Sequence, residues 1–190
     1  MRKPVSLFLL LAAAPLAQAH TFGAEGAGFF AGLAHPLSGL DHLLAMLAVG
    51  LWSAWAAPKQ VWAMPLAFMA AMAVGAALGF AGVSLPYVET GIGASVLVLG
   101  ALLTFLVRLP VAAGALLVAL FAVCHGHAHG GELPQAALPL AYAAGFLLTT
   151  GGLHVAGIFI GRALGEQRSL ALRAIGATMG LTGVWLLAGA

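Results

Sequence analysis

Histidine is the residue type whose number and spacing in this 190-residue chain point to chemistry. There are seven histidines beside only seven basic and five acidic side chains. His35 lies upstream of the pair Asp41-His42, and residues 125–129 carry three more histidines at alternate positions. Neutral imidazole is a ligand suited to nickel, cobalt, copper and zinc, and carboxylates add charge neutralisation. The pattern predicts a site for a divalent transition-metal ion.

The spacing of the first group predicts which of its side chains meet. His35 and His42 are seven residues apart, so they share one face of a continuous helix, and Met46 lies near that face one turn further on. Asp41 points about 100° away on an ideal helix, although a proline and a glycine between the histidines can bend the helix. Asp41 is a metal ligand, a carboxylate that orients a metal-bound His42, or half of a polar packing pair. Met46 is more typical of a core residue than of a soft ligand.

The second group follows the same helical logic. In a regular helix His125, His129 and Glu132 share a face and His127 points the opposite way. The neighbouring glycines can unwind this end, and that phase would then be lost. Cys124 precedes the group and is either a small apolar residue or a soft ligand. Three histidines in five residues favour metal binding over packing.

The overall composition places these residues in a membrane. The chain is 63% hydrophobic and 6% charged, with a mean hydropathy of +1.09, whereas soluble domains carry about 25% charged residues. This excludes a soluble enzyme, a nucleic-acid binder and a disordered chain. The single cysteine excludes an intrachain disulfide framework and a Cys-rich metal site. We therefore expect an integral membrane protein whose surroundings are the lipid bilayer.

The first nineteen residues have the pattern of a cleaved signal peptide. Arg2 and Lys3 precede a short apolar stretch at residues 5–14, and Ala-Gln-Ala at 17–19 fits a cleavage site. The apolar stretch is too short for a hydrocarbon core about 30 Å thick. Cleavage would leave one domain, residues 20–190, with His20 at a new N-terminus outside the inner membrane of a bacterium-like cell.

The remaining chain divides into six apolar segments, which predicts an all-α bundle of six transmembrane helices. Each segment is long enough to cross the bilayer. They cover residues 29–56, 61–83, 86–107, 110–129, 135–161 and 170–189. With both termini periplasmic, all five basic residues of this part fall on the cytoplasmic side, as the positive-inside rule requires: Lys59, Arg108, Arg162, Arg168 and Arg173. Trp52, Trp55 and Trp62 near Lys59 are typical of an interfacial aromatic belt.

Counting residues from the basic side gives an expected depth for each candidate ligand. At 1.5 Å per residue, one set lies about 25–29 Å above the basic residues: Asp41, His42, Glu89 and His125. His154 lies only about 12 Å above them and is either a deeper ligand or a packing residue. The others lie nearer the outer mouth: His20, His35, His127, His129 and Glu132. Ionisable residues inside a membrane by default mark an ion path or a functional site.

Three stretches of the chain resemble the HupE/UreJ family of nickel/cobalt permeases. They are residues 35–50 (His-Pro…Gly…Asp-His…Met…Val-Gly), residues 86–91 (Pro-Tyr-Val-Glu-Thr-Gly) and residues 125–130 (His-Gly-His-Ala-His-Gly). The signal peptide and the six segments agree as well, so the resemblance covers essentially the whole chain. Cys124 departs from it, because similar members commonly have Phe there. The five residues between His35 and Asp41 are one more than in a separate nickel/cobalt transporter family with more helices.

The resemblance implies inward transport of Ni²⁺, with Co²⁺ as a second cargo, for hydrogenase or urease maturation. It implies a permease and not an enzyme, with the metal as cargo and no permanently bound cofactor. The chain has no G-x-x-x-x-G-K-[ST] loop, so we expect no ATP hydrolysis by this chain, and nothing in it indicates an ATPase partner. The oligomeric state is left open, with a homo-oligomer among the alternatives.

Three other classes compete with a permease. A haem-binding cytochrome subunit needs two facing histidines at one depth, and the counts separate His42 from His154 by about 13 Å. An intramembrane metalloenzyme lacks its His-Glu-x-x-His motif here, and no serine or cysteine has a recognisable nucleophile setting. A sensor or accessory subunit that binds metal without moving it would use the same ligands, and sequence alone does not separate it from a permease.

Overall fold

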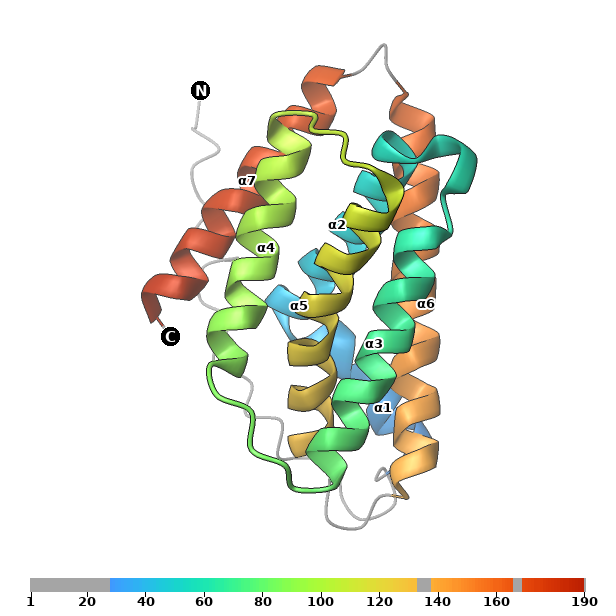
Figure 1. Ribbon diagram of the computed structural model, residues 1–190, viewed down its shortest axis with the longest axis vertical. Helices are drawn as coiled ribbons and strands as arrows, with labels where there is room; N and C mark the ends of the chain where they lie inside the picture. Colours follow the sequence, from blue (N-terminus) through green and yellow to red (C-terminus); the bar gives the residue numbers. More distant parts are fainter. Residues whose placement is uncertain (1–27, 133–137, 166–168, 190) are drawn as a thin grey trace, which may run out of the picture.

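The computed structural model of the chain describes residues 28–132, 138–165 and 169–189. These residues form a helical bundle without strands (Figure 1), which confirms the predicted all-α class. The elements in order are α1 (Phe29–Ser38), α2 (Leu40–Ala56), the 3-10 helix η2 (Pro58–Gln60), α3 (Ala63–Phe80), α4 (Val88–Thr104), α5 (Val111–Gly131), α6 (Pro139–Leu164) and α7 (Ser169–Gly189). The predicted signal peptide and His20 lie outside the described residues.

Every predicted apolar segment contains helix, but the helices differ in their ability to cross a membrane. Four are long and apolar enough alone: α3, α5, α6 and α7. The first segment passes only as the pair α1 and α2, which are bent by 84° relative to each other, and α4 has 17 residues and is shorter. The chain is therefore a multi-pass membrane protein. The crossings by the α1–α2 pair and by α4 stay a prediction.

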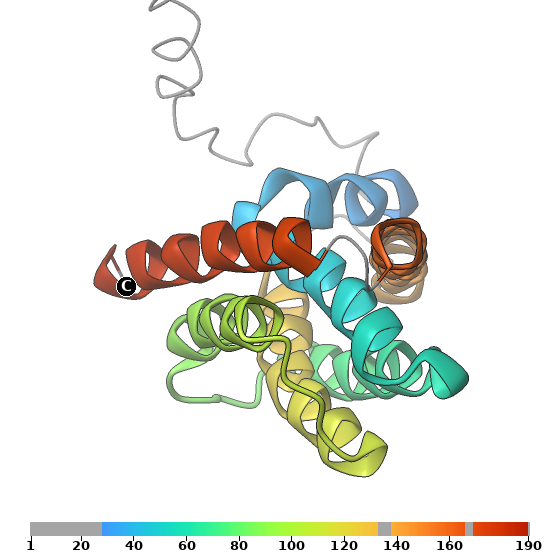
Figure 2. The same cartoon turned by 90° about the horizontal axis from the view of Figure 1, so that it is seen from above.

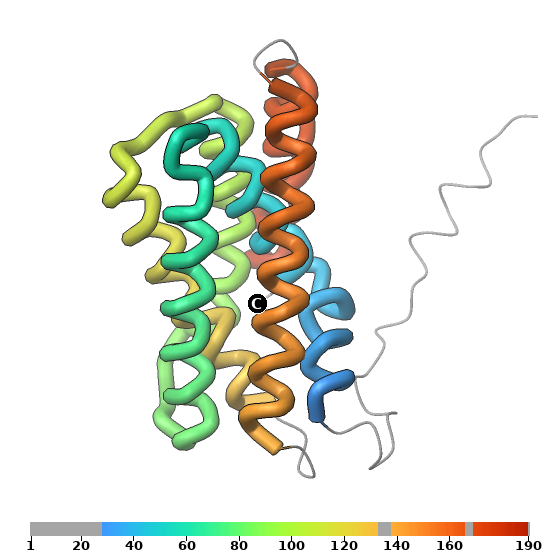
Figure 3. Tube along the Cα trace, turned by 90° about the vertical axis from the view of Figure 1, so that its right-hand side faces the viewer, coloured from blue at the N-terminus to red at the C-terminus, as the bar shows by residue number. Residues whose placement is uncertain are grey.

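The break between α1 and α2 departs from the continuous helix expected over residues 29–56. Gly39 has extended backbone angles, φ −96° and ψ 121°, and separates the two helices. Pro36 lies inside α1 and has no N–H for a helical hydrogen bond. The Asp41 carboxylate accepts a hydrogen bond from the backbone N–H of His42 at 2.7 Å, in the first turn of α2. Figure 3 shows α1 turned away from the line of α2 and packed along α6.

Close helix packing depends on glycine at the crossing points. Three pairs pack most extensively: α3 with α5, α4 with α7, and α2 with α6 (Figure 2). A Cβ added at Gly50 of α2 would overlap the carbonyl oxygen of His154 on α6. One added at Gly126 of α5 would overlap the carbonyl oxygen of Met72 on α3. Both contacts lie beside histidines, so the small residues set the distance between the histidine-bearing helices.

The two ends of the bundle differ in charge. Figure 1 shows η2, the α4–α5 connection, the end of α6 and the start of α7 at its upper end. These segments carry all the basic residues of the described part of the chain: Lys59, Arg108, Arg162 and Arg173. The α3–α4 connection and the end of α5 lie at the opposite end, and Glu89 and Glu132 belong to that end. The predicted segregation of basic residues is therefore present in the fold.

Candidate metal site

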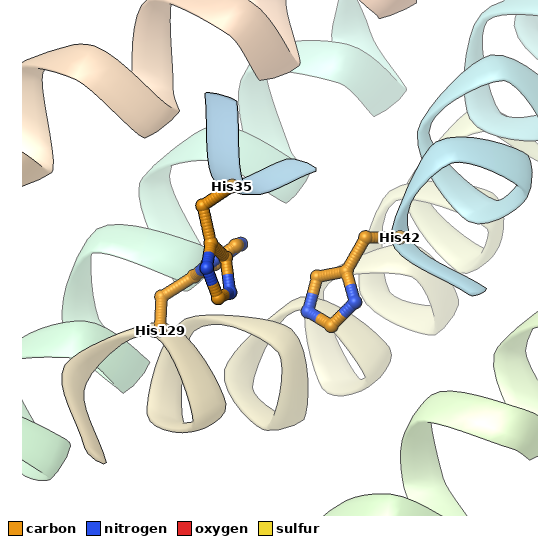
Figure 4. Close-up of side chains that lie close together, drawn as sticks. All are labelled: His35, His42 and His129. Carbon is orange, nitrogen blue, oxygen red and sulfur yellow. The ribbon is translucent and has the colours of Figure 1, made fainter. Parts of the chain in front are cut away.

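Three histidines from three helices meet at the acidic end of the bundle. His35 comes from the last turn of α1, His42 from the first turn of α2 and His129 from the last turn of α5 (Figure 4). One ring nitrogen of each can be chosen so that all three lie within 4.8 Å of one another. Two nitrogens bound to one ion at about 2.1 Å lie at most about 4.2 Å apart. A small inward movement therefore brings all three onto a single ion.

The bend at Gly39 explains why this cluster is tighter than the residue count predicts. Counting places His35 and His129 nearer the mouth than His42. In the structure the His42 ring centre lies 5.9 Å from that of His35 and 4.7 Å from that of His129. The His35 and His129 ring centres are 4.7 Å apart. Because α1 is turned against α2, His35 reaches the level of His42 and the two expected levels become one.

Asp41 orients His42. Its Oδ1 lies 2.8 Å from Nδ1 of His42. A carboxylate accepts, so Nδ1 of the neutral ring carries the proton and Nε2 keeps a free lone pair. The Nε2 atom is buried and has no hydrogen-bond partner in the part of the chain that the structure describes. This is the arrangement of a carboxylate that supports a metal-binding imidazole, one of the roles expected for Asp41.

His125 extends the cluster along α5. Its ring centre is 4.8 Å from that of His42. Ser95 donates its hydroxyl hydrogen to the carbonyl of Ile92 at 2.6 Å, and its oxygen lies 2.9 Å from Nε2 of His125. Ser95 therefore accepts from Nε2–H. This leaves a free lone pair on the buried Nδ1 of His125, which has no partner within residues 28–132, 138–165 and 169–189. The predicted face of α5 is confirmed, since the helix stays regular to Gly131 and His129 lies on the same side.

His154 lies deeper in the bundle, on α6. Its Nδ1 lies 2.8 Å from the carbonyl oxygen of Met46, which only accepts, so Nδ1 carries the proton. Its Nε2 is buried, and none of the described residues is its hydrogen-bond partner. Phe68 lies between His125 and His154, with its ring centre 5.7 Å from that of His125 and 5.1 Å from that of His154. The Met46 sulfur accepts a hydrogen bond from Thr150 at 3.1 Å in the same region.

The other candidate residues lie around the cluster. His35 pairs with Glu132 at 3.1 Å, and this hydrogen bond holds the pKa of the Glu132 carboxyl below its ordinary value. His127 points away, donating from Nε2 to the Val83 carbonyl at 2.7 Å, as its phase predicts. Glu89 is exposed in the first turn of α4. Cys124 is half-buried, and its sulfur faces Gly91 of α4.

Several side chains that shape the site carry only a weak signal in the sequence, or none. Ser95 fixes the tautomer of His125, and Phe146 stacks on His129 at 4.6 Å with an interplanar angle of 8°. Tyr142 lies 6.0 Å from His35 between ring centres, and its buried hydroxyl has no hydrogen-bond partner among the residues that the structure describes. Polar residues within apolar segments are a hint for Ser95 and Tyr142. Their partners follow only from the helix packing.

Trp52 is fully buried, unlike the interfacial position expected, and donates to the Val107 carbonyl at 2.9 Å.

Comparison with known proteins shows the family to which the chain belongs. The family described as HupE / UreJ protein matches residues 7–186. The chain belongs to the HupE/UreJ family. It is 44% identical over 180 residues to a protein called Protein HupE from Rhizobium leguminosarum bv. viciae, covering 94% of each chain. No solved structure matches. The family motifs that the sequence resembles contain His35, His42, His125 and His129, which the fold brings into contact.

Proposed function

We propose that this protein is a permease that carries Ni²⁺, and Co²⁺ as a second cargo, inward across the bacterial inner membrane. The observation that carries the proposal is the set of buried imidazoles with ring nitrogens that have no hydrogen-bond partner among the described residues: His42, His125, His129 and His154. A buried polar atom without a partner costs free energy, about 1–3 kcal/mol for each group. Four such rings in one bundle are accounted for by a cargo ion that binds them in turn.

The donor chemistry supports a borderline divalent ion. Imidazole nitrogen with supporting carboxylate suits nickel, cobalt, copper and zinc, whereas magnesium and calcium prefer oxygen ligands. The membership in the HupE/UreJ family, together with its resemblance to nickel/cobalt permeases, favours nickel and cobalt within that set. Supply of the metal to hydrogenase or urease maturation belongs to the same proposal.

The arrangement offers a path with three stages. Glu132 and His35 at the acidic end capture the ion, with Glu89 adding negative charge there. His42, His129 and His125 then replace its water ligands, with Asp41 holding His42 in the binding tautomer. His154 receives it further in. An inside-negative potential of 100 mV favours entry of a divalent ion by about 4.6 kcal/mol, so import needs no chemical coupling step.

Uptake of radioactive ⁶³Ni²⁺ into liposomes containing the purified protein, with an imposed inside-negative potential, tests the proposal. We expect saturable uptake that excess Co²⁺ suppresses and excess Mg²⁺ does not. Empty liposomes are the control. Tight nickel binding without flux would contradict a permease and support a metal sensor or accessory subunit, which uses the same ligands.

A further inference from the structure

We propose that Phe68 is the barrier that separates the outer histidine cluster from His154, and that its ring must move for an ion to pass. The inference rests on the proposed transport function. It concerns the step between binding at the outer cluster, meaning His35, His42, His125 and His129, and arrival at the inner imidazole.

The ring contacts form one continuous series from the outer cluster inward. His42 contacts His125 at 4.8 Å, His125 contacts Phe68 at 5.7 Å, and Phe68 contacts His154 at 5.1 Å between ring centres. Both imidazoles beside Phe68 have a buried nitrogen with a free lone pair. Phe68 is fully buried and is the member of the series that offers no ligand atom. An ion that leaves His125 for His154 must therefore displace this ring.

The inner side of Phe68 is built to accept an ion. His154 is 1% exposed, and its proton is fixed on Nδ1 by the Met46 carbonyl. Thr150 lies one turn before it on α6, 3.1 Å from the Met46 sulfur and 4.0 Å from the Met72 sulfur. Thioether sulfur and imidazole are both ligands for borderline and soft transition metals. An apolar ring between two donor groups keeps hard, strongly hydrated ions from passing while the ring stays in place.

The helix packing around Phe68 explains why its ring, and not the backbone, has to move. Gly126 of α5 holds that helix against the Met72 carbonyl on α3, one turn after Phe68. Gly50 and Gly157 hold α2 against α6 at the level of His154. Backbones in such close contact have little room to shift relative to one another. Rotation of a side chain is the smaller change.

Transport and binding are measured separately to test the barrier. Phe68→Ala and Phe68→Leu are expected to raise the initial rate of ⁶³Ni²⁺ uptake at saturating metal at least threefold, and Phe68→Trp to lower it at least tenfold. All three should keep the equilibrium Kd of the detergent-solubilised protein for Ni²⁺ within twofold. The matched control is Met64→Ala, because Met64 is equally buried one turn earlier on α3 and packs against Gly114. Rates within twofold of wild type for the Phe68 variants, or the same rise for Met64→Ala, would overturn the proposal.

A second readout does not depend on nickel transport. In a Cys124→Ser, His154→Cys background, Ag⁺ added in nitrate buffer to the outside of spheroplasts blocks the thiol from later labelling by a maleimide. Replacing Phe68 by Ala or Leu should speed this block at least tenfold, and Met64→Ala should not. Equal rates of block with and without the Phe68 ring would contradict the proposal that Phe68 is a barrier, even if the protein imports nickel. Faster block in Phe68 variants of a protein that imports no nickel would support the barrier and contradict the proposed permease function.

Discussion

At the scale of single residues, the site is defined by which ring nitrogen carries a proton. Three acceptors, Asp41, Ser95 and the Met46 carbonyl, each take a hydrogen bond from one nitrogen of a neighbouring imidazole. The opposite nitrogen of each ring is buried and has no hydrogen-bond partner in the described part of the chain. Neutral rings whose tautomers are fixed in advance are ready to bind a cation without first losing a proton. Ion capture then costs only the removal of water from the ion and small movements of the rings.

Asp41→Asn tests this use of the carboxylate. The variant keeps a similar shape but loses the charge that supports His42, so we expect Ni²⁺ affinity to fall about 10–100-fold. Equilibrium dialysis with ⁶³Ni²⁺ on solubilised protein measures the change. Glu89→Gln is the control, since Glu89 is exposed at the start of α4, and it should lose less than threefold. An Asp41→Asn protein that binds as tightly as wild type would refute the orienting role.

His42→Ala and His127→Ala test whether only the histidines that point into the cluster are needed for transport. His42 lies at the centre of the cluster, in ring contact with His35, His125 and His129. Its removal should abolish ⁶³Ni²⁺ uptake while the protein still accumulates in the membrane. His127 instead bonds to the Val83 carbonyl. Its replacement should keep at least half of the wild-type rate, and equal loss in the two variants would show that the cluster is not the path.

At the scale of helices, glycine contacts position the histidines. Gly50→Ala would push a methyl group into the His154 carbonyl and separate α2 from α6. Overpacking of this kind costs about 1–3 kcal/mol, so the Tm in detergent should fall by several degrees. Gly152→Ala on α6 is the matched control, because a Cβ there meets nothing within 4 Å. Its Tm should stay level or rise. Equal Tm values for the two variants would show that the α2–α6 contact does not limit stability.

The same contacts mark what sequence alone predicts. Hydrophobic segments and the helical phase of residues 125–132 are local properties, and the positions of the helices and the opposite directions of His125 and His127 follow from them. Pro36 and Gly39 allow the helix to break, but the 84° angle of the bend also depends on how α1 packs against α6, which is a long-range contact. Sequence phase puts His35 and His42 on one face of one helix. The fold brings them together across a break instead.

Side chains that shape the site without being metal ligands are the part that the sequence alone does not identify. Ser95 lies thirty residues from the histidine that it orients, and Phe68 lies far from both of the histidines that it contacts. In an apolar chain with ten phenylalanines, nothing local distinguishes this one. For Trp52 a local signal is present but wrong. Its nearness to Lys59 favours an interfacial position, whereas in the structure it is buried and its hydrogen bond to the Val107 carbonyl links α2 to the α4–α5 connection.

At the scale of the whole molecule, the basic residues and the outer histidine cluster lie toward opposite ends. The described basic residues gather at the end that carries η2 and the α4–α5 connection. Glu132 and the outer histidine cluster lie toward the other end. If the basic end faces the cytoplasm, a cation entering from outside meets carboxylate and imidazole first. The membrane potential then draws it toward His154.

Cysteine labelling tests this orientation and the crossings that helix length leaves undecided. In a Cys124→Ser background we expect Val83→Cys to react with an impermeant maleimide in spheroplasts, and Lys59→Cys and Phe105→Cys to react only after permeabilisation. All three positions are exposed outside the main helices or at their ends. If the bent α1–α2 pair re-enters without crossing, Lys59, Val83 and Phe105 all change sides. If α4 does not cross, Val83 and Phe105 share a side. Either pattern would break the path from the acidic end to the cytoplasm, because the outer cluster needs helices α1, α2 and α5 to present their histidines at the same face of the membrane.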